Sequence, residues 1–546
     1  MRQFILLMNL LFFFHPEISA QMKPKADLIL LNAKIYTVDE DFRIAEALAV
    51  KEGKFIEIGN NADIQGKYNA GNVIDAGGMP VYPGFIDSHC HFYGYAVSLQ
   101  QIDLTYTNSF EEVLTLLQKK SADIPGEWLV GRGWDHNKWP VRIFPDRSKL
   151  DSLFPDRPVV LIRIDGHVVL ANGAALKRGG FGSGQAFNPG EVEIKHERLS
   201  GILSENAADK MRNAIPEPDH HILAELLAMA QRNCFAVGLT GVADAGLEYY
   251  QVKFIDSLQK SGKLKMYVYG MLSPTAENID NFIVKGKYQT SDLNIRSVKL
   301  YADGSLGSRT ALLTKPYSDD PDNNGILANP VDYIRRICQI AYKNGYQVNT
   351  HAIGDSAVRI VCKIYQEFLK GENDLRWRVE HSQVVDPNDL ALFGKYSIIP
   401  SIQATHATSD MYWAGERLGK ERIKWAYAYK SLLDQNGWII NGTDFPIENI
   451  SPLFTFYASV TRKDLKGMPL EGFQIENALS RSEALKSMTI WAAKGCFEET
   501  SIGSIEKGKS ADFVILDKDI MTIPESEIPR VIVNKLFIGG FKVYEK

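Results

Sequence analysis

The sequence predicts an α/β protein: a (β/α)8 TIM-like barrel with an insertion after strand 1, plus a small β-sandwich domain formed by both chain ends. Eight apolar, strand-like segments recur through the middle of the chain, and most are separated by segments of helical periodicity. About 145 residues separate the first two of these segments, whereas a β/α unit needs about 30–40. Both chain ends consist of short apolar runs broken by turn residues.

Both ends of the chain are expected to pair into one sheet domain. Short strand-like apolar runs, separated by turn residues, occur at both ends of the chain. Near the N-terminus they are DLILLNAKIYTV, ALAVKEGKFIEIGN and NVIDAGGMPVYPG, and near the C-terminus GSIEKGKSADFVILD and RVIVNKLFIGGFKVYEK. Residues 21–82 and 497–546 are therefore assigned to the composite β-sandwich, and residues 83–496 to the barrel. The turn at Pro83-Gly84 marks the passage between them.

The barrel strands are read from apolar runs of strand length. In chain order they cover residues 85–92, 239–246, 265–272, 295–304, 346–355, 376–382, 397–406 and 437–446. An insertion at about 105–215 follows strand 1 and carries strand and helix signals of its own. It leaves the barrel at the end where barrel active sites lie, so we expect it to cap the site.

The first 20 residues resemble a secretory signal peptide. Arg2 precedes an apolar run over residues 4–14, Pro16 breaks the run, and Ala20 offers a small residue at the end. The run is shorter than the roughly 20 apolar residues that span a bilayer. The protein is thus expected to be exported, to the periplasm or outside the cell, with no stable membrane span after signal removal. The alternative is a buried N-terminal strand or helix.

Bulk composition describes an ordinary globular chain. It has 546 residues, 45% of them hydrophobic, and a formal charge of -5, which gives no support to nucleic-acid binding. The five cysteines are scattered and odd in number, so buried free thiols are expected rather than a disulfide framework. A small-molecule substrate is the expected partner, and the sequence leaves open whether the chain forms a homo-oligomer.

Polar side chains occur at the carboxyl ends of the predicted strands. Strand 1 ends in His89 and His91, and later strands end in Lys299, His351, His381 and Asp444. Each residue alone reads as a buried, hydrogen-bonded group. Together, on one rim of a barrel, they would be costly to bury without a common partner. Neutral imidazoles and carboxylates are natural ligands of divalent metals, so the sequence predicts a metal site.

This constellation resembles the amidohydrolase superfamily. HxH on strand 1, Lys on strand 4, His on strands 5 and 6 and Asp on strand 8 carry the resemblance, with the flanking β-sandwich. A narrower resemblance, to the amidohydrolase family 3 branch that includes N-substituted formamide deformylases, rests on GRGWDHNKW, IRIDGHVVLAN, KLYADGSLGSRTALL, HAIGDSAV, VEHSQ and GTDFPIENISPL. The resemblance runs from about residue 27 to residue 546.

The resemblance implies a centre with one or two divalent metal ions, zinc being expected. His89 and His91 would bind the more buried metal, with Asp444 close by. His351 and His381 would bind a second metal or help to position the first. Lys299 occupies the position of a carboxylated lysine that bridges two metals in many relatives.

The predicted chemistry is hydrolysis of a non-peptide carbon–nitrogen bond in an amide, formamide or cyclic amide. Zinc lowers the pKa of a bound water towards about 7 and polarises the carbonyl under attack. Asp444 is the expected general base, which takes the water proton and later delivers it to the leaving nitrogen; the alternative is a helix N-cap before Pro446.

Substrate contacts are predicted for three further residues. His167 and His406 would either bind the substrate carbonyl or hydrogen-bond the scaffold. Arg309 would meet a carboxylate or form a structural salt bridge. Trp134 and Trp139 either line the pocket or pack inside the insertion.

Other activities use the same barrel rim. A phosphotriesterase would do so, and so would a deaminase, which needs an acidic residue after strand 5. Asp355 is the residue available, although glutamate is more typical there. A catalytically inactive relative that serves as a binding module is the alternative from outside the enzymes, but none of the expected ligands is missing.

Overall fold

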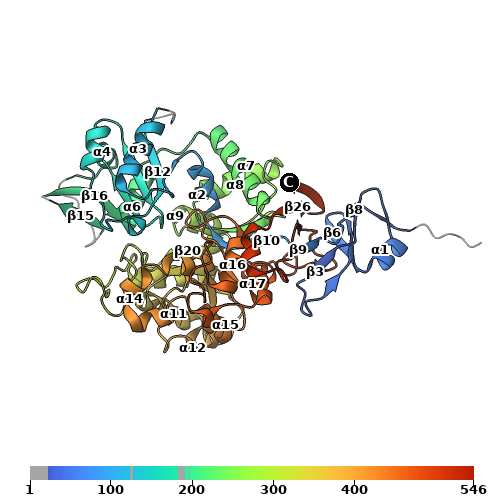
Figure 1. Cartoon of the computed structure of the whole chain (residues 1–546). Helices are drawn as coiled ribbons and strands as arrows, with labels where there is room; N and C mark the ends of the chain where they lie inside the picture. Colours follow the sequence, from blue (N-terminus) through green and yellow to red (C-terminus); the bar gives the residue numbers. More distant parts are fainter. Residues whose placement is uncertain (1–22, 123, 125–126, 183–190, 196) are drawn as a thin grey trace, which may run out of the picture.

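The computed structural model describes residues 23–122, 124, 127–182, 191–195 and 197–546, and Figure 1 shows the arrangement of their elements. The predicted signal peptide lies outside these residues. Eight parallel strands follow one another in chain order around the central sheet, which confirms the predicted barrel; a short ninth strand, β19 (Tyr288–Gln289), pairs antiparallel with the fourth. The eight parallel strands are β10 (Phe85–Cys90), β17 (Leu239–Leu247), β18 (Tyr267–Leu272), β20 (Leu293–Tyr301), β21 (Gln347–Ala352), β22 (Arg378–His381), β23 (Ile399–Ile402) and β24 (Ile440–Asn441).

The barrel closes between its first and last strands through residues that follow β24. Thr443 N donates to the Asp87 carboxylate at 3.1 Å, and Asp444 N donates to the His89 carbonyl at 2.8 Å. His91 N donates in turn to the Phe445 carbonyl, also at 2.8 Å. The eighth strand is therefore shorter than predicted, because the chain leaves extended geometry here and Asp444 adopts a φ of 60°. This closure holds Asp444 against the strand that carries the first two histidines.

Amphipathic helices cover the barrel. Among them are α7 (His220–Ala236), α8 (Tyr249–Lys260), α10 (Val331–Lys343), α11 (Asp355–Leu369) and α15 (Tyr429–Asn436). Helix α10 is typical: Ile334, Ile337, Cys338 and Ala341 recur at helical spacing and are buried in the main hydrophobic core. After β24 come α16 (Pro452–Thr461), α17 (Arg481–Ser487) and α18 (Ile490–Gly495).

Both chain ends contribute to one β-sandwich. A four-stranded sheet runs β6-β5-β2-β8, and a six-stranded sheet runs β27-β26-β25-β9-β3-β4. In the second sheet β25 (Phe513–Leu516), from the C-terminal end, pairs antiparallel with β9 (Pro80–Pro83), from the N-terminal end. Apolar side chains fill the space between the sheets, and Phe513 stacks on Phe537 with ring centroids 4.4 Å apart. The remaining strands are β2 (Leu28–Leu31), β3 (Lys34–Tyr36), β4 (Ile44–Ala45), β5 (Ala47–Lys51), β6 (Lys54–Gly59), β8 (Val73–Asp75), β26 (Val533–Ile538) and β27 (Phe541–Glu545).

The segment between β10 and β17 forms an inserted subdomain. Its sheet runs β11-β12-β13-β14-β16-β15 and is flanked by α3 (Phe110–Lys120) and α6 (Glu205–Asn213). Helix α3 begins where the Ser109 side chain accepts a hydrogen bond from the Glu112 N–H. In Figure 1 this subdomain and the sandwich lie at opposite ends of the molecule, with the barrel between them. Its strands are β11 (Ile102–Asp103), β12 (Leu129–Trp134), β13 (Val159–Arg163), β14 (Val168–Ala171), β15 (Val192–Lys195) and β16 (Arg198–Ser204).

Two simpler expectations can be compared with this structure. All five cysteines are buried free thiols, as predicted. Among the described helices, none has the length and apolarity that a bilayer crossing requires.

Candidate metal centre

The Asp444 carboxylate lies among four imidazoles at the carboxyl end of the barrel. Its Oδ1 is 3.5 Å from His89 Nε2 and 3.3 Å from His91 Nε2. Its Oδ2 is 4.0 Å from His381 Nδ1 and 3.7 Å from His406 Nε2. Burial would raise the pKa of Asp444, but the neighbouring imidazoles hold it well below its usual range. The aspartate is therefore an anion at the centre of the cluster.

A buried ion-pair network orients His89. Its Nδ1 lies 2.5 Å from Glu380 Oε2, and Glu380 pairs with Arg378 at 2.7 Å and accepts a hydrogen bond from Ser401 Oγ. Burial would raise the pKa of Glu380, but Arg378 and His89 hold it below its usual range. Since His89 Nδ1 faces a carboxylate, its Nε2 is the nitrogen turned toward Asp444.

Unusual backbone geometry directs two of the side chains into the site. Consecutive residues of a strand point to opposite faces, yet both Glu380 and His381 contact the histidine cluster. His381 ends β22 with a φ of 72°, which breaks the alternation. Its Nδ1 is 2.7 Å from Gln403 Oε1, and its ring centroid is 4.9 Å from that of His89.

Lys299 lies against the deepest histidine. Its Nζ is 3.1 Å from His89 Nε2 and 5.0 Å from the centre of the Tyr301 ring. Burial lowers the pKa of Lys299 to about 8. The amine therefore lies at the edge of the imidazole cluster, within reach of a metal ion that these imidazoles would bind.

His351 belongs to the same rim but turns away from Asp444. Its Nε2 is 3.1 Å from the Gly304 carbonyl and 3.6 Å from Asp303 Oδ1, while its ring lies 4.5 Å from that of His381. Burial lowers the pKa of His351 and of His381 well below the usual value. Both imidazoles are neutral, the form in which histidine binds metals.

The residues present fit a divalent metal. Two groups have ligand atoms within 4.8 Å of one another: His89, His91 and Asp444, and His381, His406 and Asp444. Asp444 Oδ1 and His406 Nε2 are buried and have no hydrogen-bond partner among the described residues. Unpaired buried polar atoms are costly, and a cation in reach of both would satisfy them.

Three residues were predicted to contact substrate, and the structure separates them. His167 faces the site: its ring is 4.9 Å from that of His351 and its Nδ1 is 2.8 Å from Glu205 Oε2. His406 lies among the possible metal ligands instead, with its Nδ1 3.1 Å from Gln383 Nε2. Arg309 pairs with Asp319 at 2.9 Å and is not among the residues that line the cavity.

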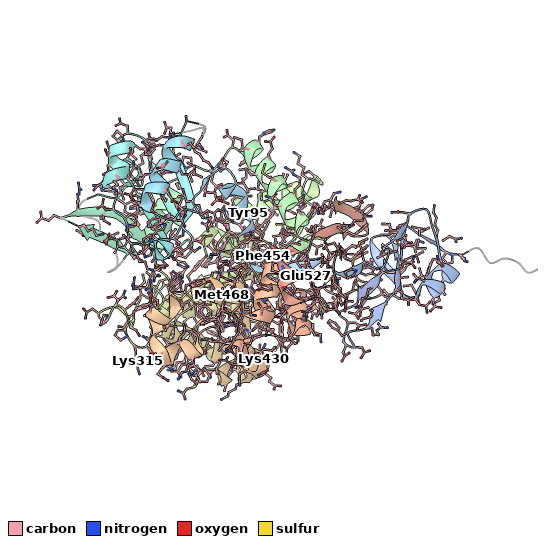
Figure 2. All side chains as sticks on the ribbon, in the orientation of Figure 1. Tyr95, Lys315, Lys430, Phe454, Met468 and Glu527 are labelled. Atoms are coloured by element: carbon pink, nitrogen blue, oxygen red, sulfur yellow. The ribbon has the colours of Figure 1, made fainter. Side chains whose placement is uncertain are left out.

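A cavity of about 810 Å³ lies over the metal centre, between the barrel and the inserted subdomain. His351, His381, His406 and Asp444 line its floor. Tyr95 and Phe454, both labelled in Figure 2, belong to its apolar wall. Trp134 and Trp139 instead stack on each other, 5.8 Å apart, in the core of the inserted subdomain. The insertion thus covers the site, as expected.

Several residues that support the site were not identified from the sequence. Glu380 and Gln403 contact ligating histidines, and Arg132 of the inserted subdomain lines the cavity. A charged pair inside the apolar run RWRVEHS was a usable signal for Glu380, because buried strands rarely carry charge without a partner. Gln403 and Arg132 have no such signal, since only the fold places them beside the histidines.

Comparisons with known proteins agree with this geometry. The sequence model of the amidohydrolase family matches residues 72–544. YtcJ of Bacillus subtilis is 31% identical over 524 residues, which cover 94% of this chain and 98% of that protein. The N-substituted formamide deformylase of Arthrobacter pascens is 25% identical over 552 residues, covering 96% of this chain and 99% of that enzyme.

Among solved structures, an uncharacterized metal-dependent hydrolase from Pyrococcus horikoshii OT3 superposes with a TM-score of 0.74 at 29% identity. The match covers 91% of this chain and 99% of that one. Family model, relatives and structure each span nearly the whole chain. This protein is therefore a member of the amidohydrolase family, with the fold of metal-dependent hydrolases.

Proposed function

We propose that the protein hydrolyses a non-peptide carbon–nitrogen bond in an amide, formamide or cyclic amide, with one or two zinc ions as cofactor. The observation that carries the proposal is the anionic Asp444 carboxylate among four imidazoles on the floor of the cavity. The full-length likeness to an N-substituted formamide deformylase supports this bond type.

The residues that would hold metal are His89, His91, Lys299, His351, His381, His406 and Asp444. A divalent metal, when bound, supplies a Lewis acid for the carbonyl and an acidified water. Lys299 would serve as an anionic metal ligand after carboxylation, in which its neutral amine adds to carbon dioxide and releases a proton. Burial favours that neutral amine, since it lowers the pKa of Lys299 to about 8.

Asp444 is the proposed general base. Its carboxylate is ionised and faces the cavity, so it can take a proton from the attacking water. The same group then returns that proton to the leaving nitrogen. Its side chain faces the histidines and makes no helix-capping hydrogen bond to a described residue, so the capping role considered from the sequence is not supported.

His167 is the proposed contact for the substrate carbonyl. Burial would lower the pKa of His167, but the Glu205 carboxylate raises it to about 9. His167 is therefore a cation at neutral pH, on the cavity wall facing His351. A positive donor in that place stabilises the negative charge that develops on a carbonyl oxygen under attack.

The proposal is tested with zinc-loaded enzyme and matched panels of N-formyl amines, N-acyl amines and cyclic amides. Asp444→Asn is expected to lower kcat/KM by at least about a hundredfold; circular dichroism verifies the fold, and metal analysis verifies that the variant is compared at full metal content. Hydrolysis that persists in Asp444→Asn at full metal content contradicts the assigned base. If no compound in any of the panels is hydrolysed, the proposed bond type is wrong.

The structure does not favour the deaminase alternative, because Asp355, the acidic residue it would need, lies outside the cavity lining. Asp355 instead accepts hydrogen bonds from Thr314 N and Thr314 Oγ1. The alternative of an inactive binding module is not favoured either, because every predicted ligand is present. Metal analysis of the purified protein that finds no zinc, iron or manganese would favour it.

Export of the protein is a separate proposal and rests on residues 1–20 alone. Cell fractionation of the full chain, with deletion of this segment as the comparison, tests it. We expect the full chain outside the cytoplasm, shortened near Ala20, and the deletion variant inside.

A further inference from the structure

We propose that Arg132 binds a carboxylate on the substrate, so that the enzyme prefers N-acyl or N-formyl compounds carrying an acidic group. This inference rests on the proposed function and names its substrate class. It starts from GRGWD, a motif of the inserted subdomain that none of the metal or proton chemistry uses.

Arg132 lies on the wall of the cavity without a partner. Its guanidinium makes no hydrogen bond or ion pair with any described residue, and its Nε is fully buried. Burial and the nearby Arg212 lower the pKa of Arg132 only to about 10, so it stays charged at neutral pH. Arg132 as a whole is partly buried, and leaving a guanidinium nitrogen buried and unpaired is costly, which indicates that a ligand completes the site.

The other charged groups of the cavity are already satisfied. Arg163 lies between Asp135 and Asp165, 2.5 Å from each. Three further lining carboxylates have hydrogen-bond partners: Asp103 with Thr105 N, Asp410 with Tyr427 Oη and Glu448 with Ser409 Oγ. Asp444 belongs to the metal centre. Lys138 is exposed at the edge of the cavity. Arg132, a partly buried cation without a partner among the described residues, therefore remains to match one negative charge.

Local backbone geometry directs the Arg132 side chain toward the cavity. Gly133 has a φ of 104°, and a Cβ there would lie 2.5 Å from Thr105 Oγ1, so only glycine fits. The pairing of β12 with β13 shifts register between Arg132 and Trp134. This bulge lets Trp134 enter the core of the inserted subdomain while Arg132 lines the cavity.

The guanidinium lies close to the proposed reaction centre. Arg132 Nη2 is 4.0 Å, and Ile447 Cδ1 3.6 Å, from the position that a Cβ would take on Gly166. Gly166 immediately precedes His167, whose ring faces His351. A substrate whose carbonyl meets His167 and the metal centre can thus place a nearby carboxylate on Arg132. The planar guanidinium pairs with a carboxylate through two parallel hydrogen bonds.

The test compares N-formylphenylalanine with N-formylphenethylamine, which differ only in the carboxylate. With zinc-loaded enzyme, the ratio of their kcat/KM values is expected to favour the acid and to fall at least about tenfold in Arg132→Met. Arg132→Lys, which keeps the charge but loses the planar fork, should give an intermediate ratio. Arg142→Met is the matched control: this arginine of the same subdomain pairs with Glu416 on the exposed surface, and the wild-type ratio should persist.

Two results would overturn the inference: no preference for the acid in the wild type, or an unchanged ratio in Arg132→Met. If neither compound is hydrolysed, calorimetric binding separates this inference from the proposed function. Weaker binding of N-formylphenylalanine to Arg132→Met, relative to the neutral compound, supports the carboxylate site although formamide hydrolysis has failed. If Arg132→Met binds N-formylphenylalanine, relative to the neutral compound, as well as the wild type does, both the carboxylate site and the proposed formamide hydrolysis are overturned. Circular dichroism of each variant verifies folding.

Discussion

His89 Nδ1 and Glu380 Oε2 lie 2.5 Å apart in a fully buried contact that joins the first and sixth strands of the barrel. The contact determines which nitrogen of His89 faces the metal centre. A ligating histidine commonly donates its other ring N–H to a carboxylate, which fixes the tautomer and increases the basicity of the ligand. Arg378 holds Glu380 in turn.

Glu380→Gln is expected to weaken zinc binding about 10–100-fold, because the amide cannot supply the negative charge that stabilises the His89 N–H donor. Competition with a chelating dye measures the affinity. Glu498→Gln is the matched control, since Glu498 is a buried glutamate that accepts hydrogen bonds from Gln289 and Asn294, away from the metal centre. Equal zinc affinities for wild type and Glu380→Gln would rule out the orienting role.

If Lys299 is carboxylated as proposed, the metal content is expected to depend on carbon dioxide. Loading with zinc in bicarbonate is expected to give about one more metal per chain than loading in buffer stripped of carbon dioxide, because the carbamate would add an anionic ligand. Lys299→Met should give the lower stoichiometry in both buffers. Metal analysis after gel filtration reports the numbers, and a wild-type stoichiometry indifferent to bicarbonate counts against carboxylation.

His406 is expected to act on the metal more than on the substrate. Its Nε2 faces Asp444 and has no hydrogen-bond partner among the described residues. His406→Asn should therefore lower zinc affinity at least about tenfold, whereas His167→Asn should leave zinc affinity unchanged and raise KM. The opposite result, normal zinc affinity with a raised KM in His406→Asn, would show that His406 contacts the substrate and does not bind the metal.

His136 is expected to make the stability of the fold depend on pH. It is buried beside Arg163, whose Nε donates to His136 Nδ1 at 3.3 Å. Burial, together with Arg163 and Arg417, lowers its pKa from 6.5 to about 2. The unfolded chain binds a proton below pH 6.5 that the folded chain does not bind, so this contribution to stability is complete above pH 6.5 and is lost as the pH falls.

Between pH 7 and pH 5 the loss is expected to be about 2 kcal/mol, and His136→Gln should abolish that part of the pH dependence. Chemical denaturation at a series of pH values measures it. His221→Gln, a change at an exposed histidine, serves as the control with the wild-type slope. Parallel pH profiles for His136→Gln and wild type would contradict the assignment.

Local pattern predicted much of the barrel and of the metal centre. His89, His351 and His381 follow apolar runs of strand length, and parallel strands in a closed sheet bring their carboxyl ends to one rim. Chain order and strand length are encoded locally, so the sequence alone predicts that these residues come together. The eighth strand was overestimated, because its backbone leaves extended geometry to place Asp444 beside His89.

Contacts between distant parts of the chain depend on the tertiary structure. The pairing of His89 with Glu380 joins residues 291 positions apart, and the positive φ of His381, which breaks the alternation of side chains along β22, has no local signature. Likewise, Arg309 and Arg132 look alike in sequence, yet one is neutralised by Asp319 and the other lines the cavity without a partner. Periodicity reports which face of an element is buried, while the partner of each buried charge depends on how the inserted subdomain packs over the barrel.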